Sequence, residues 1–294
     1  MHEAAKALRS SHKMGLLLVT ASAVAWSTAG LFTHIIPLDI GTMLVWRGLF
    51  GAIGILVFAL ILQGGTVIHD FGKMGWPGWS FAVVSAFGML CFITSLRITT
   101  VAHVSIIYAT VPLGAAVMAW LVIGEKPSRS AIIASIFSLV GVGIIVGFGV
   151  EGNLTGDLLA FAMTFSLAVM MVISRRYQNI PIMPAACISA LLSGAVALPF
   201  SHGLLVSGYE LSLLALFGIV NSAIGLGLFT LGARMLPAIE TALIGVLDAP
   251  LAPIWVWLFF AETPSRATLI GGTVVFAAVI SHIVQQSRGS TQVN

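Results

Sequence analysis

Apolar stretches of about twenty residues follow one another along almost the whole chain of 294 residues. Each is long enough to cross, as an α-helix, a hydrocarbon core about 30 Å thick. Only 8% of the residues are charged, against about 25% in a soluble domain, so the chain could not cover a water-facing surface. The stretches are continuous and do not alternate, which disfavours a transmembrane β-barrel. The fold class that follows is an all-α polytopic membrane protein.

Ten of these stretches are expected to be transmembrane helices joined by short loops. Their approximate ranges are 14–34, 42–62, 76–98, 103–122, 130–149, 157–175, 183–203, 211–233, 238–260 and 266–285. Because the loops leave no room for a soluble domain, we expect one integral membrane unit.

Lysine and arginine predict the orientation of these helices. With the N-terminus in the cytoplasm, three basic residues lie toward the outside, Arg47, Arg97 and Arg266. Ten lie inside: Lys6, Arg9, Lys13, Lys73, Lys126, Arg129, Arg175, Arg176, Arg234 and Arg288. Because short cytoplasmic loops carry the basic excess, we expect both termini in the cytoplasm and the chain in the inner (plasma) membrane.

One short motif occurs twice. The sequence GEKPSRS at 124–130 recurs as AETPSRA at 261–267, an offset of 137 residues. At this offset, nine of the 33 positions from Arg97 to Arg129 are identical. Shared apolar composition explains the Ile, Ala and Leu matches, but it does not explain Arg, Trp, Glu and Pro-Ser-Arg in one register. The first copy follows the fourth expected span and the second follows the ninth, so the copies face opposite sides of the membrane.

The chain is therefore interpreted as two five-helix halves in inverted orientation, residues 1–150 and 151–294. Inverted repeats are typical of secondary transporters, whose substrate site lies near the bilayer midplane where the halves meet. Three prolines stand inside spans that correspond in the two halves, Pro112 in the fourth and Pro250 and Pro253 in the ninth. They are interpreted as kinks that take part in gating, and passive kinks are the alternative.

These features resemble the EamA-type transporters of the drug/metabolite transporter superfamily. The resemblance is strongest from Leu96 to Val146 and from Leu231 to Gly272, and AWST at 25–28 resembles the first-helix signature of that family. It implies ten helices with both termini inside. It also implies a central cavity formed by spans one to four and six to nine, with spans five and ten at the periphery. The implied activity is export of amino acids, aromatic and neutral ones above all, or of related small metabolites.

Polar residues near the middle of the spans are candidates to line that cavity, because a polar group in hydrocarbon is costly. They are Trp26, Ser27, Tyr108, Ser166, Asn221 and Asp248. Helix packing is the alternative for Trp26, Ser27, Ser166 and Asn221. Asp248 is the one acid expected at this depth, where it would contact a substrate ammonium group or a coupling proton. A hydrogen bond that holds the kinked segment is the alternative for Asp248.

Arg47 enters the second span by about one turn. It could extend to the outer interface, or it could face the cavity and bind a substrate carboxylate, which suits a guanidinium group.

The repeated motif places an acid at the C-terminal end of a helix, where the helix dipole disfavours it. Such an acid needs a compensating partner, and an arginine follows four residues later in each copy. The pairs Glu125 with Arg129 and Glu262 with Arg266 are therefore predicted to clamp loops.

Transport is favoured over the other functions open to a membrane protein. Enzyme motifs such as a complete HExxH or a nucleophile elbow are missing from the sequence, so no enzyme activity, cofactor or metal is expected. A channel would need a filter or a charged ring. Among carriers, nucleobases, cationic drugs and other metabolites are alternatives to amino acids. The expected partners are a small-molecule substrate and the lipid bilayer, with no nucleic acid, in a monomer or weak homodimer.

The inverted repeat predicts opposite locations for its two copies. A reporter fused after Glu125 should report the cytoplasm, and one fused after Glu262 should report the periplasm, because five spans separate the fusion points. Paired alkaline phosphatase and green fluorescent protein fusions measure this. Both fusions on one side would contradict the inverted repeat.

Overall fold

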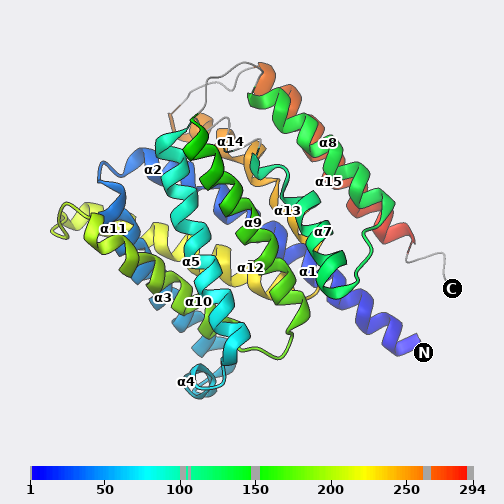
Figure 1. Ribbon diagram of the computed structural model, residues 1–294, viewed down its shortest axis with the longest axis horizontal. Coiled ribbons are helices and arrows are strands. Elements are labelled where there is room, and N and C mark those ends of the chain that lie inside the picture. The colour runs from blue at the N-terminus through cyan, green and yellow to red at the C-terminus, as the bar shows by residue number, and fades with distance from the viewer. Residues whose placement is uncertain (1, 100–103, 105–106, 147–152, 261–265, 290–294) are drawn as a thin grey trace.

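The computed structural model describes residues 2–99, 104, 107–146, 153–260 and 266–289, and these segments are almost wholly helical (Figure 1). The helices are α1 (His2–Ser27), α2 (Ala29–Ile35), α3 (Ile40–Gln63), α4 (Thr66–Phe71), α5 (Gly75–Ile98), α7 (Val111–Ile123), α8 (Arg129–Val146), α9 (Leu154–Arg176), α10 (Ile182–Ala197), η1 (Leu198–Phe200), α11 (Gly208–Phe217), η2 (Gly218–Leu226), α12 (Gly227–Gly232), α13 (Ala238–Gly245), α14 (Asp248–Phe260) and α15 (Arg266–Gly289).

Seven stretches within the described residues are long and apolar enough to cross a membrane: Ser11–Thr33, Ile40–Gln63, Gly75–Ser95, Leu154–Arg176, Ile182–Phe200, Gly208–Gly232 and Ala238–Phe259. Three shorter apolar helices, Val111–Ile123, Arg129–Ile144 and Leu269–Gln285, coincide with the other three expected spans. The all-α polytopic fold is therefore confirmed, and the count of ten spans stays a prediction.

The outward-facing side chains are large and apolar, as lipid contact requires. Examples from four different helices are Leu17, Ile61, Phe137 and Leu269, each more than half exposed. In a soluble protein such a surface would be an aggregation hazard, so the bilayer is the solvent for this face.

Local sequence explains where several helices begin and end. The carboxylate of Asp39 accepts a hydrogen bond from the backbone N–H of Thr42 at 2.9 Å and so caps α3. Burial opposes ionisation of this carboxyl group, but the bonds from Thr42 and His202 outweigh it and lower the pKa of Asp39. Gly64 ends α3 and Gly124 ends α7, both at positive φ that glycine adopts without strain.

The helices pack in a small set of neighbouring pairs. At one edge of the molecule α8 and α15 lie side by side, and they correspond to the fifth and tenth expected spans (Figure 1). In the interior α3 packs against α10 and η2, α5 against α9 and α10, and α1 against α12 and η2. The N-terminal end of α1 and the C-terminal end of α15 lie on the same side of the molecule (Figure 1).

The fourth and ninth expected spans are broken, and the breaks occupy equivalent positions in the repeat. The chain turns at 109–110 before α7 and at 246–247 before α14, again 137 residues apart. The two helices that follow each have 13 residues. Pro112 is the second residue of α7 and Pro250 is the third residue of α14, so these prolines begin new helices instead of kinking continuous ones. The first turn favours proline because its N–H groups have no partner within the helix.

The α3–α10 crossing depends on glycine. A Cβ atom at Gly48 would lie 2.6 Å from the carbonyl oxygen of Ala190 and 3.1 Å from the Cα atom of Gly194. Both obstacles are backbone atoms, which cannot move aside as a flexible side chain can.

We therefore expect Gly48→Ala to lower the unfolding free energy in detergent by about 1–3 kcal/mol, because the added methyl group overpacks the crossing. Gly114→Ala is the matched control, since nothing lies within 4 Å of its Cβ position in α7. Alanine should leave that helix equally stable or slightly more stable. Equal thermal midpoints for the two variants would contradict the close approach of α3 and α10.

Candidate functional site

Arg47 is buried in the interior with its side chain only 5% exposed, so it does not extend to the membrane interface. Its Nη2 atom donates to Oδ1 of Asn221 at 3.2 Å, and its guanidinium carbon lies 5.2 Å from the ring centre of Phe217. Its Nε atom is buried without a hydrogen-bond partner within the described part of the chain. The described partners of this cation are therefore a neutral amide and an aromatic ring.

Asn221 connects the arginine to the end of α1. It lies in η2, which has π-helical hydrogen bonding, and such distortions of a helix are frequent at functional sites. Its Nδ2 atom lies 3.4 Å from the carbonyl oxygen of Ala25 and 3.5 Å from that of Trp26, while its own carbonyl accepts from Trp26 Nε1 at 3.0 Å. Because α1 ends at Ser27, its last carbonyls lack partners within the helix, and the amide supplies one.

Ser27 and Trp255 tie α1 to α14. Trp255 Nε1 donates to Ser27 Oγ at 2.7 Å, and that hydroxyl donates to the carbonyl of Val24 at 2.7 Å. The ring of Trp26 packs against Phe229, with 4.9 Å between the ring centres. The sequence analysis identified Trp26 and Ser27 but missed Trp255, which carries no polar signal beyond its indole N–H.

Tyr108 and Asp248 meet where the two broken spans cross. Asp248 is the first residue of α14, where the helix dipole stabilises its carboxylate. Its carboxyl group lies close to the hydroxyl of Tyr108. The same hydroxyl lies 3.5 Å from the carbonyl oxygen of Gly245. Tyr108 and Gly245 are 137 residues apart, so they occupy equivalent positions in the repeat and lie side by side.

Ser166 contacts its own helix and α5. Its hydroxyl donates to the carbonyl of Ala162 at 2.7 Å, one turn earlier in α9. A Cβ atom at Gly88 in α5 would lie 3.0 Å from the Cβ atom of Ser166. These contacts agree with the packing alternative, and they do not bring Ser166 to Arg47 or Asp248.

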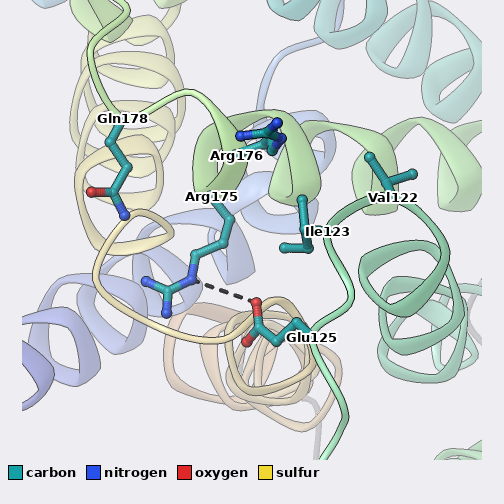
Figure 2. A pocket seen from close by; sticks show the side chains of 6 residues that line it. All are labelled: Val122, Ile123, Glu125, Arg175, Arg176 and Gln178. Carbon is teal, nitrogen blue, oxygen red and sulfur yellow. Dashed lines mark ion pairs between the residues drawn. The ribbon is translucent and has the colours of Figure 1, made fainter.

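Glu125 follows α7 at the end of the molecule that is predicted to be cytoplasmic. The structure pairs it with Arg175 of α9, Oε2 to Nε at 3.5 Å, instead of the predicted Arg129 (Figure 2). Arg129 is exposed at the start of α8, whereas α9 ends beside the C-terminus of α7 and brings its basic last turn to the acid. The second predicted clamp involves Glu262, which lies outside the described residues, and Arg266, the exposed first residue of α15.

The Glu125–Arg175 pair lines a surface pocket of about 440 Å³ (Figure 2). The other lining residues are Val122, Ile123, Arg176 and Gln178. Arg175 also donates to the carbonyl of Arg234 at 3.0 Å, and Arg234 donates to the carbonyl of Ile180. Burial lowers the pKa of Arg234, because water no longer fully solvates its charge. These contacts join the ends of α9 and α12 to the segment before α10.

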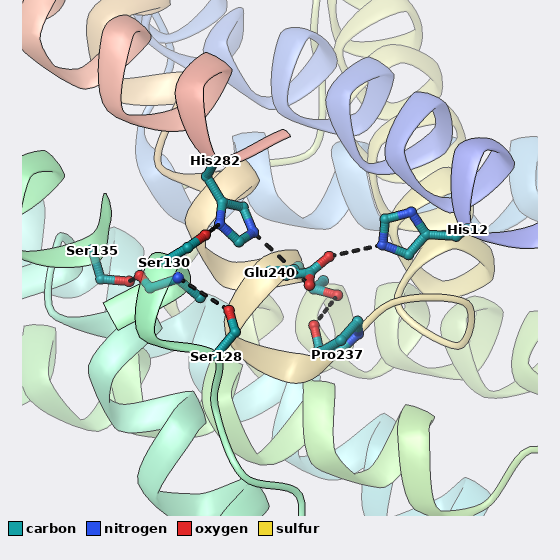
Figure 3. A network of polar contacts seen from close by, with 9 residues as sticks. His12, Ser128, Ser130, Ser135, Pro237, Glu240 and His282 are labelled. Atoms are coloured by element: carbon teal, nitrogen blue, oxygen red, sulfur yellow. Dashed lines mark hydrogen bonds and ion pairs between the residues drawn. The ribbon is translucent and has the colours of Figure 1, made fainter. Parts of the chain in front are cut away.

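A second polar cluster surrounds Glu240 in α13 (Figure 3). This acid is 2% exposed, so Asp248 is not the only acid at a buried position of the expected ninth span, and the sequence analysis missed it. His12 Nε2 lies 3.0 Å from its Oε2 atom, and His282 Nε2 lies 3.8 Å from its Oε1 atom. Glu240 could have been identified from the sequence, because it is an ionisable residue within the apolar span expected at 238–260.

Among the described residues near the broken helices are a buried cation, Arg47, whose partner Asn221 lies beside the end of α1, and a partly buried acid, Asp248, at the start of α14. Arg47 can bind an anionic group such as a carboxylate or phosphate, and Asp248 can bind a cationic group or a proton. Within the described residues, no group of three His, Cys, Asp or Glu side chains is arranged to hold a metal ion.

Comparison with known proteins adds three findings. The EamA-like transporter family matches the chain twice, over residues 13–147 and 154–283. A curated protein of Rickettsia felis, an S-adenosylmethionine uptake transporter, is 24% identical over 212 residues, which are 70% of this chain and 71% of that protein. One protein of known crystal structure has a TM-score of 0.80 at 18% identity, over 92% of this chain and 98% of that one, so the two share a fold.

The network around Asn221 predicts a large difference between two substitutions of buried polar residues. Asn221→Leu should lower the unfolding free energy in detergent by about 2–5 kcal/mol, because it removes the amide acceptor of the buried Arg47 cation and the amide donor to the carbonyls of Ala25 and Trp26. Ser166→Ala should cost less than about 1.5 kcal/mol, since the bond that its hydroxyl makes within the described part of the chain is to a carbonyl of its own helix. Thermal midpoints measure both, and a midpoint of Asn221→Leu equal to that of wild type would contradict the network.

Proposed function

Because the chain belongs to the EamA-like transporter family, we propose that this small-molecule transporter carries solutes with an α-amino-carboxylate group. Amino acids, aromatic and neutral ones above all, are the proposed substrates, and export across the inner membrane by alternating access is the proposed activity. The proposed unit is a monomer or weak homodimer of ten transmembrane helices with both termini in the cytoplasm.

The proposed architecture is two inverted repeats, residues 1–150 and 151–294. Two consecutive matches to one family support it, as do the 13-residue helices α7 and α14 that follow equivalent breaks. Helix packing supports it as well. The α5–α9 contact joins the third and sixth expected spans, and the α1–α12 contact joins their counterparts, the eighth and the first. Exchanging the halves therefore maps one contact onto the other, as a two-fold axis between them would.

The observation that carries the substrate class is the uncompensated charge of Arg47. Removing a cation from water costs several kcal/mol unless an anion or several hydrogen bonds replace the solvent. Arg47 has one amide acceptor, one aromatic ring and a free Nε position among the described contacts. A carboxylate accepts two parallel hydrogen bonds from a guanidinium group. A substrate carboxylate would therefore supply the missing anion once the contact between α3 and η2 opens.

Asp248 is proposed to contact the ammonium group of the same substrate. It is partly exposed at the break before α14, with the hydroxyl of Tyr108 beside it. The Trp255–Ser27 hydrogen bond links α14, which contains Asp248, to α1. From α1, hydrogen bonds lead through Trp26 and Asn221 to Arg47. An α-amino acid carries both charges that these two residues complement.

The curated relative fits the same chemistry. Its name gives S-adenosylmethionine as the solute, and that compound ends in an α-amino-carboxylate group. Its name also gives uptake, so the direction of transport has to be measured separately from the substrate. Nucleobases and simple cationic drugs lack the carboxylate that Arg47 would bind.

Substrate analogues test the two charged contacts separately. In proteoliposomes, phenylalanine should compete with labelled phenylalanine about ten- to a hundredfold better than phenethylamine, which lacks the carboxylate, because a charge-assisted bond contributes about 1.5–3 kcal/mol. It should also compete better than 3-phenylpropionate, which lacks the ammonium group. Arg47→Gln should abolish the first preference and keep the second, and Asp248→Asn should do the reverse.

The two variants control each other, because each should retain the preference that the other loses. Thermal midpoints in detergent check that both are folded. Wild-type preference for phenylalanine over phenethylamine in Arg47→Gln would refute the role of Arg47. Flux without saturation, accompanied by ionic conductance, would identify a channel instead of a carrier. Loading the label inside or outside oriented vesicles measures the direction.

A further inference from the structure

Glu240, His12 and His282 form a buried acid between two imidazoles, contributed by α13, α1 and α15 (Figure 3). His282 is 1% exposed, and its Nδ1 atom lies 2.7 Å from the hydroxyl of Ser130 in α8. Its Nε2 atom is directed at Glu240 but lies 3.8 Å away and has no hydrogen-bond partner within the described residues. A buried polar atom without a partner is uncommon and requires an explanation.

Each imidazole lies next to a more open region, His12 at its exposed surface and His282 at a neighbouring pocket. His12 is 32% exposed, whereas Glu240 is 2% exposed. His282 borders a pocket of about 140 Å³ between α8 and α15, which is lined in part by Ser130, Ser281 and Gln285. A proton could therefore reach the buried carboxylate through either histidine.

The other basic side chains that are described on the helices around α13 bind other groups or are exposed. Arg175 pairs with Glu125, and Arg234 donates to a backbone carbonyl. Lys13 of α1 and Arg129 of α8 are exposed. Both histidines lie next to the carboxylate of Glu240, and histidine is the residue type that exchanges a proton most readily near neutral pH.

We propose that His12, Glu240 and His282 form a proton-binding site that couples transport to proton movement across the membrane. The coupling rests on the proposed function, whereas the proton site stands on the geometry of the cluster alone. One proton is held by an imidazole nitrogen or a carboxylate oxygen of the cluster, and the same proton leaves to water through His12 or the pocket beside His282.

The position of the cluster explains how proton binding could drive conformational change. Glu240 and Gly245 lie on the same eight-residue helix, α13, and Gly245 contacts Tyr108 at the crossing of the broken spans. With the proton bound, an imidazolium–carboxylate pair ties α13 to α1 or α15. After the proton leaves, the imidazolium charge beside the buried carboxylate is lost, which favours a different position of α13.

Simultaneous measurement of phenylalanine flux and internal pH in proteoliposomes tests the coupling. A phenylalanine gradient should move protons in wild type, whereas Glu240→Gln should keep downhill phenylalanine flux and lose proton movement down to the level of empty liposomes. His69→Asn is the matched control, because His69 is exposed in α4 and should keep wild-type coupling. A wild-type proton-to-substrate ratio in Glu240→Gln, or phenylalanine flux without protons in wild type, would overturn the coupling.

A second measurement needs no transport, so it separates this inference from the proposed function. Histidine ¹⁵N resonances of the labelled protein in detergent are followed from pH 5 to pH 9. His282→Asn should move the titration midpoint of His12, and Glu240→Gln should move the midpoints of both His12 and His282, while the midpoint of His69 stays fixed. Independent titration of His12 and His282 that ignores both substitutions would refute the shared proton site, whatever the protein transports.

Discussion

The structure depends on one constraint, that a polar group inside hydrocarbon must find a partner within the protein. Continuous helices satisfy this for their own backbone, so the informative places are those where a helix stops. Here α1 stops at Ser27, and the amide of Asn221 reaches the carbonyls of its last turn. The ninth expected span stops at Gly245, and Tyr108 and Asp248 lie at that break. Asn221, Tyr108 and Asp248 therefore contact the chain at places where a helix stops.

Helix ends are also the natural positions for movement and binding. A helix that is already interrupted can change direction without breaking further backbone bonds, and its free N–H and C=O groups can bind a solute. The breaks before α7 and α14 are equivalent in the repeat, so one rearrangement could occur alternately in either half. Gly48 and Gly51 let α3 pack closely against α10 and η2, because neither glycine has a side chain that would have to interdigitate with the neighbouring helix. Contacts of this kind can be exchanged at low cost when the protein changes state.

Much of the fold could be predicted from the sequence, because a span needs only length and apolarity. The register of the repeat could also be predicted. Helices α7 and α14 both begin and end at positions that differ by the 137-residue offset. Hydropathy indicates how deep a residue lies in the membrane, but it does not indicate which helices are neighbours. It therefore could not predict that Glu125 pairs with Arg175, because this pair depends on where α9 ends. For the same reason Asn221 and Arg47 were both identified, but their contact was not predicted. The sequence analysis placed the interruption of this span at Pro250 and Pro253, whereas the chain turns at 246–247, because proline marks the first turn of the helix that follows and the turn itself contains only Val and Leu.

The central claim is that one substrate molecule binds with its carboxylate on Arg47 and its ammonium group on Asp248. A crystal structure with 4-bromophenylalanine bound tests this most directly, because anomalous scattering locates the bromine and fixes the orientation of the molecule. The account predicts a carboxylate about 2.7–2.9 Å from the guanidinium nitrogens of Arg47, which replaces or joins the bond to Asn221. A ligand bound elsewhere, with the Arg47–Asn221 bond unchanged and Nε still without a partner, would contradict it.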